Sequence, residues 1–398
     1  MKILMLVPFL PNTYTSGGQT RWYNLIKYLS ERHEITLYSL LKDESERRFV
    51  PELEKYCKKV KVFSRPESPW TFRNLFLTAF SFYPLLVIRN WSFKERKEIK
   101  EELEKEKYDL IHAEAFYVMP HLPATHIPNI LVEQTIEYQV YKHHVDTQVP
   151  WILKPIYMID IIKLRYWERY FWKKTTRLIA VSEDDKKVMQ EEIPGIKVEV
   201  IPNGVDADYF AKKKVERKTP PRILYLGNFK WIQNSEALGL LVSEVWPRVK
   251  SAFPKSLLWV VGRDIPKEIT NMAKDPENKI EVTEAIEDPR DAYQGSSVMV
   301  LPIKGSGGTR LKVIEAMASA LPIVSTQNGV GGLGLIPGKH ALVSDSIEKI
   351  ATDTVLLLTD RKKAEKIGKA GQEFVRKVYD WKIIVKLHDA IYKEVINE

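Results

Sequence analysis

A glycine-rich segment that leads into a helical pattern is the part of this sequence best equipped for chemistry. It reads GSGGTRLKVIEAMASALPIV and spans residues 305–324. Glycine lets a ligand approach the backbone closely, and the unpaired N–H groups at the start of a helix attract anions. Arg310 and Lys312 place two positive charges in the first turn, and Glu315 follows one turn later. The segment predicts a phosphate-binding loop.

A surface ion pair is the simpler alternative for part of this pattern. Lys312 and Glu315 lie three residues apart, and such a pair on a helix stabilises it by only about 0.2–0.5 kcal/mol. This alternative leaves the glycines unexplained, because glycine costs conformational entropy unless a tight turn or a ligand requires it. The phosphate-binding interpretation is therefore favoured.

Length and composition indicate a two-domain globular protein. The chain has 398 residues, 44% hydrophobic and 28% charged, and one hydrophobic core rarely supports that length. Cys57 is the only cysteine, which excludes an internal disulfide and a multi-cysteine metal site and fits a reducing compartment. The net charge of +9 favours anionic partners without choosing among phosphates, membrane surfaces and nucleic acid. The densest basic run, 212–218, precedes two prolines and is interpreted as an interdomain linker.

The N-terminal segment predicts a buried strand rather than a secretion signal. It has one lysine, a short apolar run that ends at Pro8, and no small-residue cleavage pattern. No run reaches the ~18 apolar residues that a spanning helix needs, and the nearest, 75–88, contains Pro84. We expect a cytoplasmic protein, with a peripheral location at the inner face of the membrane as the alternative.

Short apolar runs alternate with longer helical patterns along the whole chain. This arrangement predicts an α/β protein with parallel sheets covered by helices. The strands expected in the first half are Ile3–Val7, Ile35–Leu40, Val60–Phe63, Leu110–His112, Ile130–Val132, Leu178–Val181 and Val198–Ile201. Those expected in the second half are Ile223–Leu226, Leu257–Val261, Ile280–Val282, Val298–Leu301, Ile323–Ser325 and Ala341–Val343.

Glycines follow several of these strands. Gly17 and Gly18 follow the first strand, Gly227 and Gly262 end two strands of the second half, and the loop from Gly305 follows another. A glycine after a strand is often only a turn. In open α/β sheets, however, ligands bind at the carboxyl ends of the strands, so together these turns predict a binding cleft.

Four segments, in this order and spacing, resemble a known family. The resemblance is to the nucleotide-sugar-dependent glycosyltransferases of family 4, and it covers nearly the whole chain. The segments are VIPNGVDADYF (200–210), LYLGNFKWIQN (224–234), VMVLPI (298–303) and GSGGTRLKVIEAMASALPIVSTQNGVGGL (305–333).

The resemblance implies the GT-B fold, with two Rossmann-like domains facing across a cleft. We expect an acceptor-binding domain over residues 1–210, a donor-binding domain over 219–375, and a C-terminal segment, 376–398, that returns to the first domain. Four apolar residues at helical spacing support a final helix over 381–395: Ile384, Leu387, Ile391 and Val395.

The resemblance further implies a retaining, metal-independent transfer of a hexose or similar sugar. The donor would be a nucleoside diphosphate sugar and the acceptor a hydroxyl of a glycan or glycolipid, in cell-surface polysaccharide biosynthesis. No metal or other cofactor and no nucleic-acid partner are expected. Two alternatives remain: another GT-B activity such as a nucleotide-sugar epimerase, and a nucleotide-sugar-binding partner without turnover. A nicotinamide oxidoreductase is disfavoured because no G-x-G-x-x-G follows the first strand.

The donor half departs from the family at two cationic positions. Where many relatives carry an arginine and a lysine, this chain has Asn228 and Gln233. The leaving diphosphate still needs positive charge, so Lys230, Arg310 and Lys312 become the candidates. Arg310 ranks first because its guanidinium can bind phosphate oxygens in a bidentate manner.

A pair of glutamates with seven residues between them is the family's hallmark, and one of the two is missing. The second corresponds to Glu315, which the resemblance assigns to the ribose hydroxyls. The first corresponds to Gly307, so backbone amides of Gly307 and Gly308 are expected to replace a carboxylate. The full set expected to bind the donor is Gly227, Lys230, Gly262, Gly307, Gly308, Thr309, Arg310, Leu311 and Glu315.

The acceptor half offers a second group of candidates. In DLIHAEAF, Glu114 stands two residues after His112, where many relatives carry another histidine. A carboxylate there can take the acceptor's proton or stabilise positive sugar charge. The alternatives are that Glu114 caps a helix near Phe116 and that His112 is a satisfied histidine at a strand end. Arg310 and Lys312 complete the predicted catalytic set.

Further candidates for the acceptor and diphosphate lie at strand ends. Gly17 and Gly18 resemble the family's glycine pair, and Arg21 in the next helical turn could face phosphate or an anionic acceptor. Glu137, after a later strand, is a weaker candidate for the acceptor cleft.

Two segments combine aromatic and cationic side chains. Residues 75–91 are rich in Phe, Leu and Tyr, and residues 151–174 interleave Trp and Tyr with Lys and Arg. Such a helix can lie in a membrane interface, which would suit a lipid-linked acceptor. Packing against a neighbouring domain is the alternative.

Overall fold

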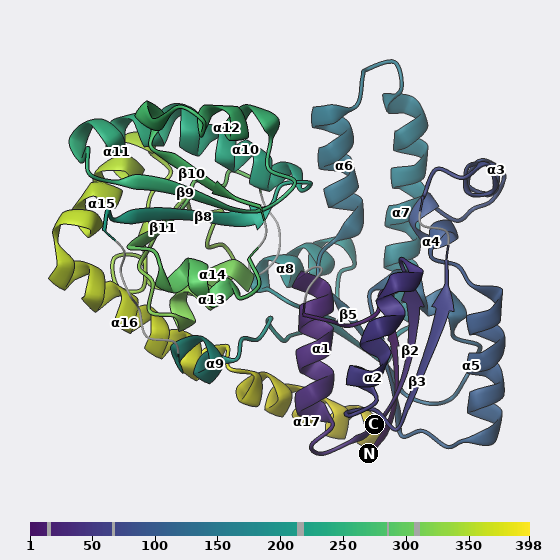
Figure 1. Ribbon diagram of the computed structural model, residues 1–398. Coiled ribbons are helices and arrows are strands. Elements are labelled where there is room, and N and C mark those ends of the chain that lie inside the picture. The colour runs from purple at the N-terminus through teal and green to yellow at the C-terminus, as the bar shows by residue number, and fades with distance from the viewer. Residues whose placement is uncertain (14–16, 66–67, 213–218, 285, 306–310) are drawn as a thin grey trace. The chain divides into compact units, whose positions relative to one another are not determined.

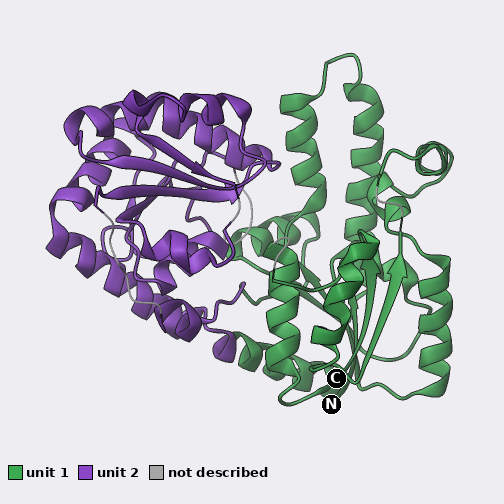
Figure 2. Cartoon of the chain, in the orientation of Figure 1, with its two compact units in different colours: residues 1–202, 384–398 green, residues 203–383 purple. Residues whose placement is uncertain are grey.

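The computed structural model divides the chain into two compact units (Figures 1 and 2). Unit 1 comprises Met1–Pro202 and Ile384–Glu398, and unit 2 comprises Asn203–Ile383. The structure describes residues 1–13, 17–65, 68–212, 219–284, 286–305 and 311–398.

Unit 1 is built on a parallel sheet in the order β3-β2-β1-β4-β5-β6-β7. The four central strands are almost wholly buried, as expected for β-branched and leucine-rich runs covered on both faces. The strands are β1 (Lys2–Val7), β2 (Glu34–Leu41), β3 (Lys59–Ser64), β4 (Leu110–Glu114), β5 (Asn129–Glu133), β6 (Arg177–Ala180) and β7 (Val198–Val200).

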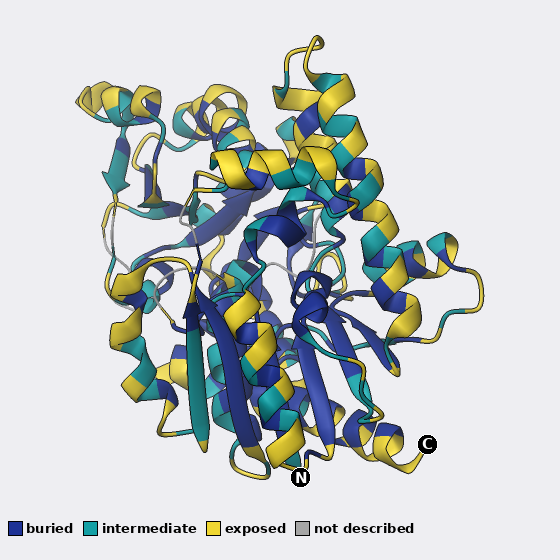
Figure 3. Cartoon of the chain, turned by 90° about the vertical axis from the view of Figure 1, so that its right-hand side faces the viewer, coloured by how far each residue is buried: buried dark blue, intermediate teal, exposed yellow. Residues whose placement is uncertain are grey.

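Helices cover this sheet with their apolar sides inward, so that its inner strands are buried while the helices present exposed faces (Figure 3). The long helices α6 and α7 lie side by side and project past the ends of the strands (Figure 1). The helical elements are α1 (Gly17–Leu29), η1 (Glu44–Phe49), α2 (Val50–Leu53), α3 (Phe72–Phe80), α4 (Leu85–Arg89), α5 (Phe93–Lys105), η2 (Phe116–His121), α6 (Glu137–Gln148), α7 (Lys154–Lys174) and α8 (Glu183–Glu192).

Unit 2 repeats the same architecture on its own core, with strand order β10-β9-β8-β11-β12-β13 and parallel pairing. Its strands are β8 (Arg222–Asn228), β9 (Leu257–Arg263), β10 (Ile280–Thr283), β11 (Val298–Leu301), β12 (Ile323–Ser325) and β13 (Leu342–Val343). Its helical elements are α9 (Ala207–Lys212), α10 (Ile232–Leu240), η3 (Leu241–Val245), α11 (Trp246–Ala252), α12 (Lys267–Met272), η4 (Pro276–Asn278), α13 (Pro289–Gln294), α14 (Leu311–Ala318), α15 (Ile347–Thr359) and α16 (Arg361–Val378).

The predicted fold class is confirmed, since both sheets are parallel and each predicted run overlaps a strand. The two units meet in sequence at residue 202, earlier than the expected boundary at 210. The reason is that Val205 exchanges backbone hydrogen bonds with Tyr379 and Trp381, and a Cβ on Gly204 would come within 2.5 Å of the Trp381 ring.

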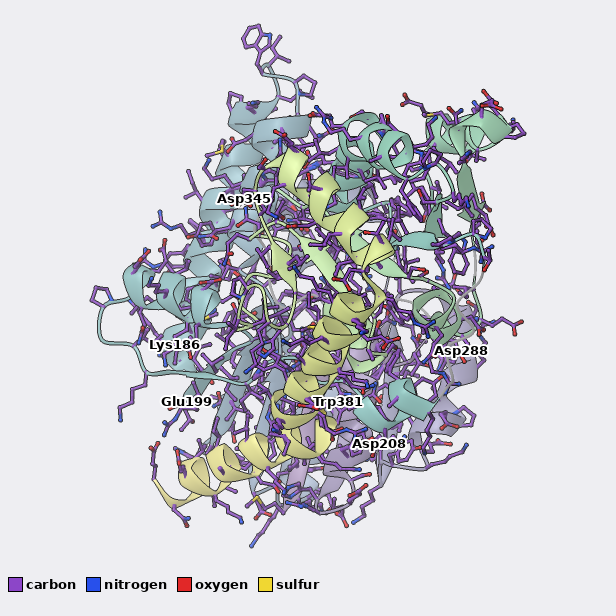
Figure 4. All side chains as sticks on the ribbon, turned by 90° about the vertical axis from the view of Figure 1, so that its left-hand side faces the viewer. Lys186, Glu199, Asp208, Asp288, Asp345 and Trp381 are labelled. Atoms are coloured by element: carbon purple, nitrogen blue, oxygen red, sulfur yellow. The ribbon has the colours of Figure 1, made fainter. Side chains whose placement is uncertain are left out.

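Ion pairs add to this attachment of the segment after residue 202. Asp208 on α9 forms salt bridges with Arg376 and Lys382. Figure 4 shows Trp381 where α16 gives way to the last helix, with Asp208 on the neighbouring α9. The predicted linker residues 213–218 lie outside the described part of the chain.

The last helix, α17 (Trp381–Asn397), begins in unit 2 and continues into unit 1. Ile384, Ile391 and Val395 are buried as their spacing predicts, but Leu387 is 40% exposed. Polar side chains of α17, Tyr392 among them, are buried against the unit 1 core instead.

Gly262 near the end of β9 lies directly against Gly227 near the end of β8. Gly262 has a φ of 147°, and a Cβ there would lie 1.7 Å from the carbonyl oxygen of Gly227. An L-residue would be strained in this conformation and would also push the strand ends apart.

We expect Gly262→Ala to lower the free energy of unfolding by roughly 3 kcal/mol, because strain and overlap add. Gly239→Ala is the matched control, since Gly239 lies on exposed α10 with open space around its Cα. That change should stabilise the helix by up to about 1 kcal/mol. Urea unfolding of both variants measures the difference, and equal stability would contradict the close contact of the two glycines.

Candidate functional site

Lys312 ties the first turn of α14 to the end of β8 in unit 2. Its Nζ donates to the carbonyl oxygen of Leu226 at 3.0 Å and to Oδ1 of Asn234 at 2.8 Å. It also lies 5.2 Å from the centre of the Tyr225 ring. A Cβ on Gly227 would lie 3.3 Å from the same ammonium group. The charge of Lys312 therefore stands at the glycine turn where β8 ends.

The loop that precedes α14 begins beside α10. A Cβ on Gly305 would come within 3.1 Å of Gln233, one of the two positions where the family's cations are replaced. Lys230 lies apart from this cluster, with its Nζ 3.6 Å from Asp264 and most of its side chain exposed. Asn228 uses its Oδ1 to accept from the backbone N–H of Lys230.

Glu315 is held by a tyrosine from the neighbouring α13. The Tyr293 hydroxyl donates to Oε2 of Glu315 at 2.7 Å. Burial raises the pKa of Glu315, while this hydrogen bond and the charge of Lys312 lower it in part. One carboxylate oxygen of Glu315 is thus engaged within unit 2.

Four predicted donor-binding residues, Gly307, Gly308, Thr309 and Arg310, lie outside the described residues. Leu311, the next predicted residue, begins α14.

Unit 1 gathers a buried polar network around Glu114 at the carboxyl end of β4. Oε2 accepts from Nε1 of Trp22 at 2.8 Å and from Nε2 of Gln134 at 3.2 Å. The Nε of Arg21 lies 3.8 Å from the same oxygen, and both side chains are fully buried. Burial favours the neutral acid, but Arg21, His112 and Trp22 together lower the pKa of Glu114. Glu114 is therefore a carboxylate at neutral pH.

His112 links this carboxylate to the last helix. Its Nε2 lies 3.0 Å from Oε1 of Glu114, and its Nδ1 lies 2.6 Å from the hydroxyl of Tyr392 on α17. A carboxylate can only accept, so Nε2–H donates to Glu114, while Nδ1 shares a hydrogen bond with the Tyr392 hydroxyl. His112 is a hydrogen-bonded residue inside the network, as its structural alternative expected.

The idea that Glu114 caps the following helix is wrong. The residue before η2 is Ala115, which has a φ of 72° and no side-chain capping hydrogen bond. This turn leaves Glu114 as the last residue of β4, with its side chain directed at α1.

The predicted glycine pair begins α1 beside this network. A Cβ on Gly18 would lie 3.2 Å from Oε1 of Gln134 and 3.7 Å from the Trp22 ring. Arg21, one turn on, donates to the carbonyl oxygen of Pro202 at 3.3 Å besides facing Glu114. Arg21 thus contacts groups of unit 1 itself.

Glu137 begins α6 within a second group of carboxyls. The backbone N–H groups of Glu137 and Tyr138 donate to Glu168 of α7 at 2.7 and 3.0 Å, so Glu168 caps α6. Burial raises the pKa of Glu137 to about 7, with Arg89 opposing the shift. Burial, with the charges of Glu133 and Glu137, raises the pKa of Glu168. Burial, with the charges of Glu137 and Glu114, raises that of Glu133.

Metal-ligand clusters are not found in the described part of the chain, where no three His, Cys, Asp or Glu side chains gather suitably. Nor is any helix among those residues long and apolar enough to cross a membrane.

Two family models match adjoining parts of the chain. The model described as Glycosyltransferase Family 4 matches residues 15–209, and the model described as Glycosyl transferases group 1 matches residues 220–360. The two matches correspond to the two sheets and together span most of the sequence. The chain belongs to the group 1 glycosyltransferases. Its two parallel Rossmann-like sheets are those of the GT-B fold.

Relatives of this glycosyltransferase resemble it over nearly its full length. An uncharacterized 44.6 kDa protein in the cps region of Klebsiella pneumoniae is 22% identical over 99% of both chains. The sulfoquinovosyl transferase of Arabidopsis thaliana is 25% identical over 96% of this chain and 71% of its own. Among solved structures, HepE of Anabaena in complex with UDP-glucose superposes with a TM-score of 0.64, at 15% identity over 99% of this chain and 100% of the other.

Several residues that contact the two polar groups of the glycosyltransferase were not predicted from the sequence. Trp22, Gln134 and Tyr392 contact Glu114 or His112, and Asn234 and Tyr293 contact Lys312 or Glu315. Asn234 and Trp22 lie within segments already singled out, so their place near a glycine turn was a usable signal. Tyr392 gave none, since it looked like one more residue of an amphipathic helix.

Neutralising Glu114 and neutralising Glu315 should change the stability of the glycosyltransferase in opposite directions at neutral pH. Because the pKa of Glu114 is lowered in the folded protein, its negative charge stabilises the fold above the ordinary pKa of about 4.3. This stabilisation is lost as the pH falls through the lowered pKa. Glu114→Gln should therefore cost about 3–5 kcal/mol at pH 7, because Arg21 loses its counter-charge. The cost should shrink below pH 4.

Glu315→Gln provides the contrast. The raised pKa of Glu315 means that wild-type stability declines as pH rises from the ordinary value through the raised one. The amide of glutamine does not ionise, so the free energy of unfolding of this variant should match that of wild type at pH 5 and equal or exceed it at pH 8. Urea unfolding between pH 4 and 8 measures the stability of both variants. If stability changed with pH in the same way in both, the opposite pKa shifts assigned to Glu114 and Glu315 would be wrong.

Proposed function

We propose that this glycosyltransferase is a retaining enzyme that transfers a hexose or similar sugar from a nucleoside diphosphate sugar to a hydroxyl of a glycan or glycolipid in cell-surface polysaccharide biosynthesis. The observation that carries the proposal is the grouping of Lys312, Glu315 and the Gly227 turn at the carboxyl ends of β8 and β11. The complex of HepE with UDP-glucose supports this donor class, and the cps-region relative supports the pathway.

The donor end of the reaction calls for positive charge on the leaving diphosphate. Breaking the glycosidic bond builds negative charge on phosphate oxygens, and fixed cations and helix N-terminal N–H groups stabilise it. Lys312 is already oriented by two hydrogen bonds, so it offers its charge without reorganisation. Arg310 and the amides of Gly307 and Gly308 are proposed to contact the diphosphate. No metal is required in this scheme.

Glu315 is proposed to bind the ribose. Its Oε2 is occupied by Tyr293, which leaves Oε1 to accept from vicinal hydroxyls. Gly227, Gly262 and Leu311 would allow close approach of the nucleotide to the backbone. Lys230, exposed beside Asp264, is proposed to contribute to the field rather than to a defined contact.

Glu114 is proposed to stabilise positive charge on the sugar rather than to take a proton. A carboxylate with a lowered pKa is a weak base, and its oxygens already accept from Trp22, Gln134 and His112. Its negative charge suits the oxocarbenium character of the transition state. Since Glu114 is fully buried, it acts through its field and by positioning Trp22 and Gln134.

Nucleotide titration with a matched pair of variants tests this proposal. Calorimetry of UDP, GDP, ADP and NAD should show one nucleoside diphosphate binding with micromolar affinity. Arg310→Ala should weaken that diphosphate about tenfold or more and leave the nucleoside unchanged, because one charge-assisted contact is lost. Glu114→Gln is the control, measured at a temperature at which this variant is folded. It should retain the affinity for the diphosphate and transfer sugar more slowly than wild type.

The outcomes separate the alternatives. Preference for NAD, or equal loss of diphosphate and nucleoside affinity in Arg310→Ala, would refute the donor assignment. Diphosphate binding without turnover of any nucleotide sugar would favour the non-catalytic binding protein.

An apolar surface on unit 1 supports a lipid-linked acceptor. Helix α3 docks on α7, since Lys163 donates to the carbonyl oxygens of Thr78 and Ser81 at 2.6 and 2.8 Å. The two helices and the residues next to their ends nevertheless leave large apolar side chains exposed: Phe72, Phe76, Phe80, Phe82, Trp151, Ile152, Ile156, Ile159, Ile162 and Tyr166. We propose that this surface rests on an anionic membrane, as the positive net charge favours.

Vesicle sedimentation tests the membrane proposal. Wild type should sediment with phosphatidylglycerol vesicles more than with phosphatidylcholine vesicles, and replacing Phe72, Phe76 and Phe80 with serine should weaken this binding at least tenfold. Ile336→Ser is the control, because Ile336 is 52% exposed on unit 2. Undiminished binding by the triple variant would assign this surface to another role.

A further inference from the structure

Two arginines of unit 1 lie close together without carboxylate partners. Arg65 follows β3 and is only 7% exposed, and its Nη1 donates to Oδ1 of Asn90 at 2.9 Å. Its Nε is buried without a hydrogen-bond partner, and so is the Nε of Arg89 at the end of α4. Among the described residues, no carboxylate oxygen lies within 4.0 Å of either guanidinium, whereas the buried Arg177 pairs with Glu199 and Glu398.

The arrangement carries an excess of positive charge. Burial, and next the charge of Arg89, lower the pKa of Arg65 to about 10. The charge of Arg89 lowers the pKa of Glu137 in part, yet burial raises that pKa to about 7. Burial also raises the pKa of Glu133. Glu46 also influences Arg65, but its oxygens accept from Gln19 and from the backbone N–H of Lys42.

Buried cations without a carboxylate partner cost free energy that an anion can offset. Two guanidinium groups with unused N–H donors match the geometry of an oxyanion, which accepts paired hydrogen bonds. Tyr117 and Tyr141 add hydroxyl groups beside the same arginines. The cluster thus has the composition of an anion site built from four segments of unit 1: the residue after β3, the end of α4, η2 and α6.

This cluster adjoins the Glu114 network. The Arg65 guanidinium carbon lies 4.8 Å from the centre of the Phe9 ring, and that ring lies 6.2 Å from the Trp22 ring. Trp22 in turn donates to Glu114. Arg65 is therefore two aromatic contacts from the network that we assign to the reacting sugar.

We propose that Arg65 and Arg89 bind an oxyanion of the acceptor, a carboxylate of an acidic sugar or a phosphate group, and so orient the acceptor hydroxyl toward the Glu114 network. The inference rests on the proposed transferase function and adds that the acceptor is anionic.

Anion titration in the presence of saturating UDP tests this inference, because UDP fills the donor phosphate site. Glucuronate and glycerol phosphate are the two anionic probes, and glucose at matched ionic strength is the neutral control. One of the anions should bind at least tenfold more tightly than glucose, and which one it is distinguishes carboxylate from phosphate. Arg65→Gln and Arg89→Gln should each weaken it about tenfold, with UDP affinity retained.

Arg96→Gln is the matched control, since Arg96 also stacks on an aromatic ring, that of Trp91, but donates to a backbone carbonyl. It should leave anion binding unchanged. Arg89 is only partly buried, so Arg89→Gln remains informative if Arg65→Gln fails to fold. Equal binding of glucose and both anions, or unchanged binding in Arg89→Gln, overturns the inference. The UDP titration is separate, so loss of anion binding alone leaves the donor assignment intact.

Discussion

The buried pairing of Arg21 with Glu114 is the constraint on which the rest of unit 1 depends. Neither charge reaches water, and an ion in a protein interior is tolerated only when opposite charge and hydrogen bonds replace its hydration. Those groups come from α1, β4, the segment after β5 and α17. The electrostatic demand of one carboxylate therefore fixes the positions of four chain segments that are remote in sequence.

Unit 2 also holds a partly buried charged side chain, that of Lys312, but with partners of another kind. Lys312 is oriented mainly by a carbonyl oxygen and an amide rather than by a carboxylate. Positive charge held close to a leaving diphosphate stabilises it, and these polar neighbours fit the role that we propose for Lys312. Because Asn228 and Gln233 replace the family's two cations, the proposal gives the start of α14 a larger share of that role.

The sequence predicted the strands well and the polar partners poorly, for a physical reason. Apolar runs such as Ile3–Val7 must be buried wherever they lie, so they can be recognised locally. Glu315 was also singled out locally, from its spacing after the glycines, and its role stays a prediction. The contacts of Tyr392 with His112 and of Arg65 with Phe9 join residues far apart in the chain, and no local pattern encodes them. Leu387 shows the converse: helical spacing predicted burial, but polar contacts of α17 took its place.

The course of α17 has a consequence for how the protein is made. The hydroxyl that completes the Glu114 network belongs to Tyr392, and all of unit 2 is synthesised between that residue and the rest of unit 1. During translation, unit 1 must therefore wait with His112 lacking this partner until the final helix arrives. A fragment ending at residue 202 would be the same incomplete state, so unit 1 is complete only when its distant last segment is supplied.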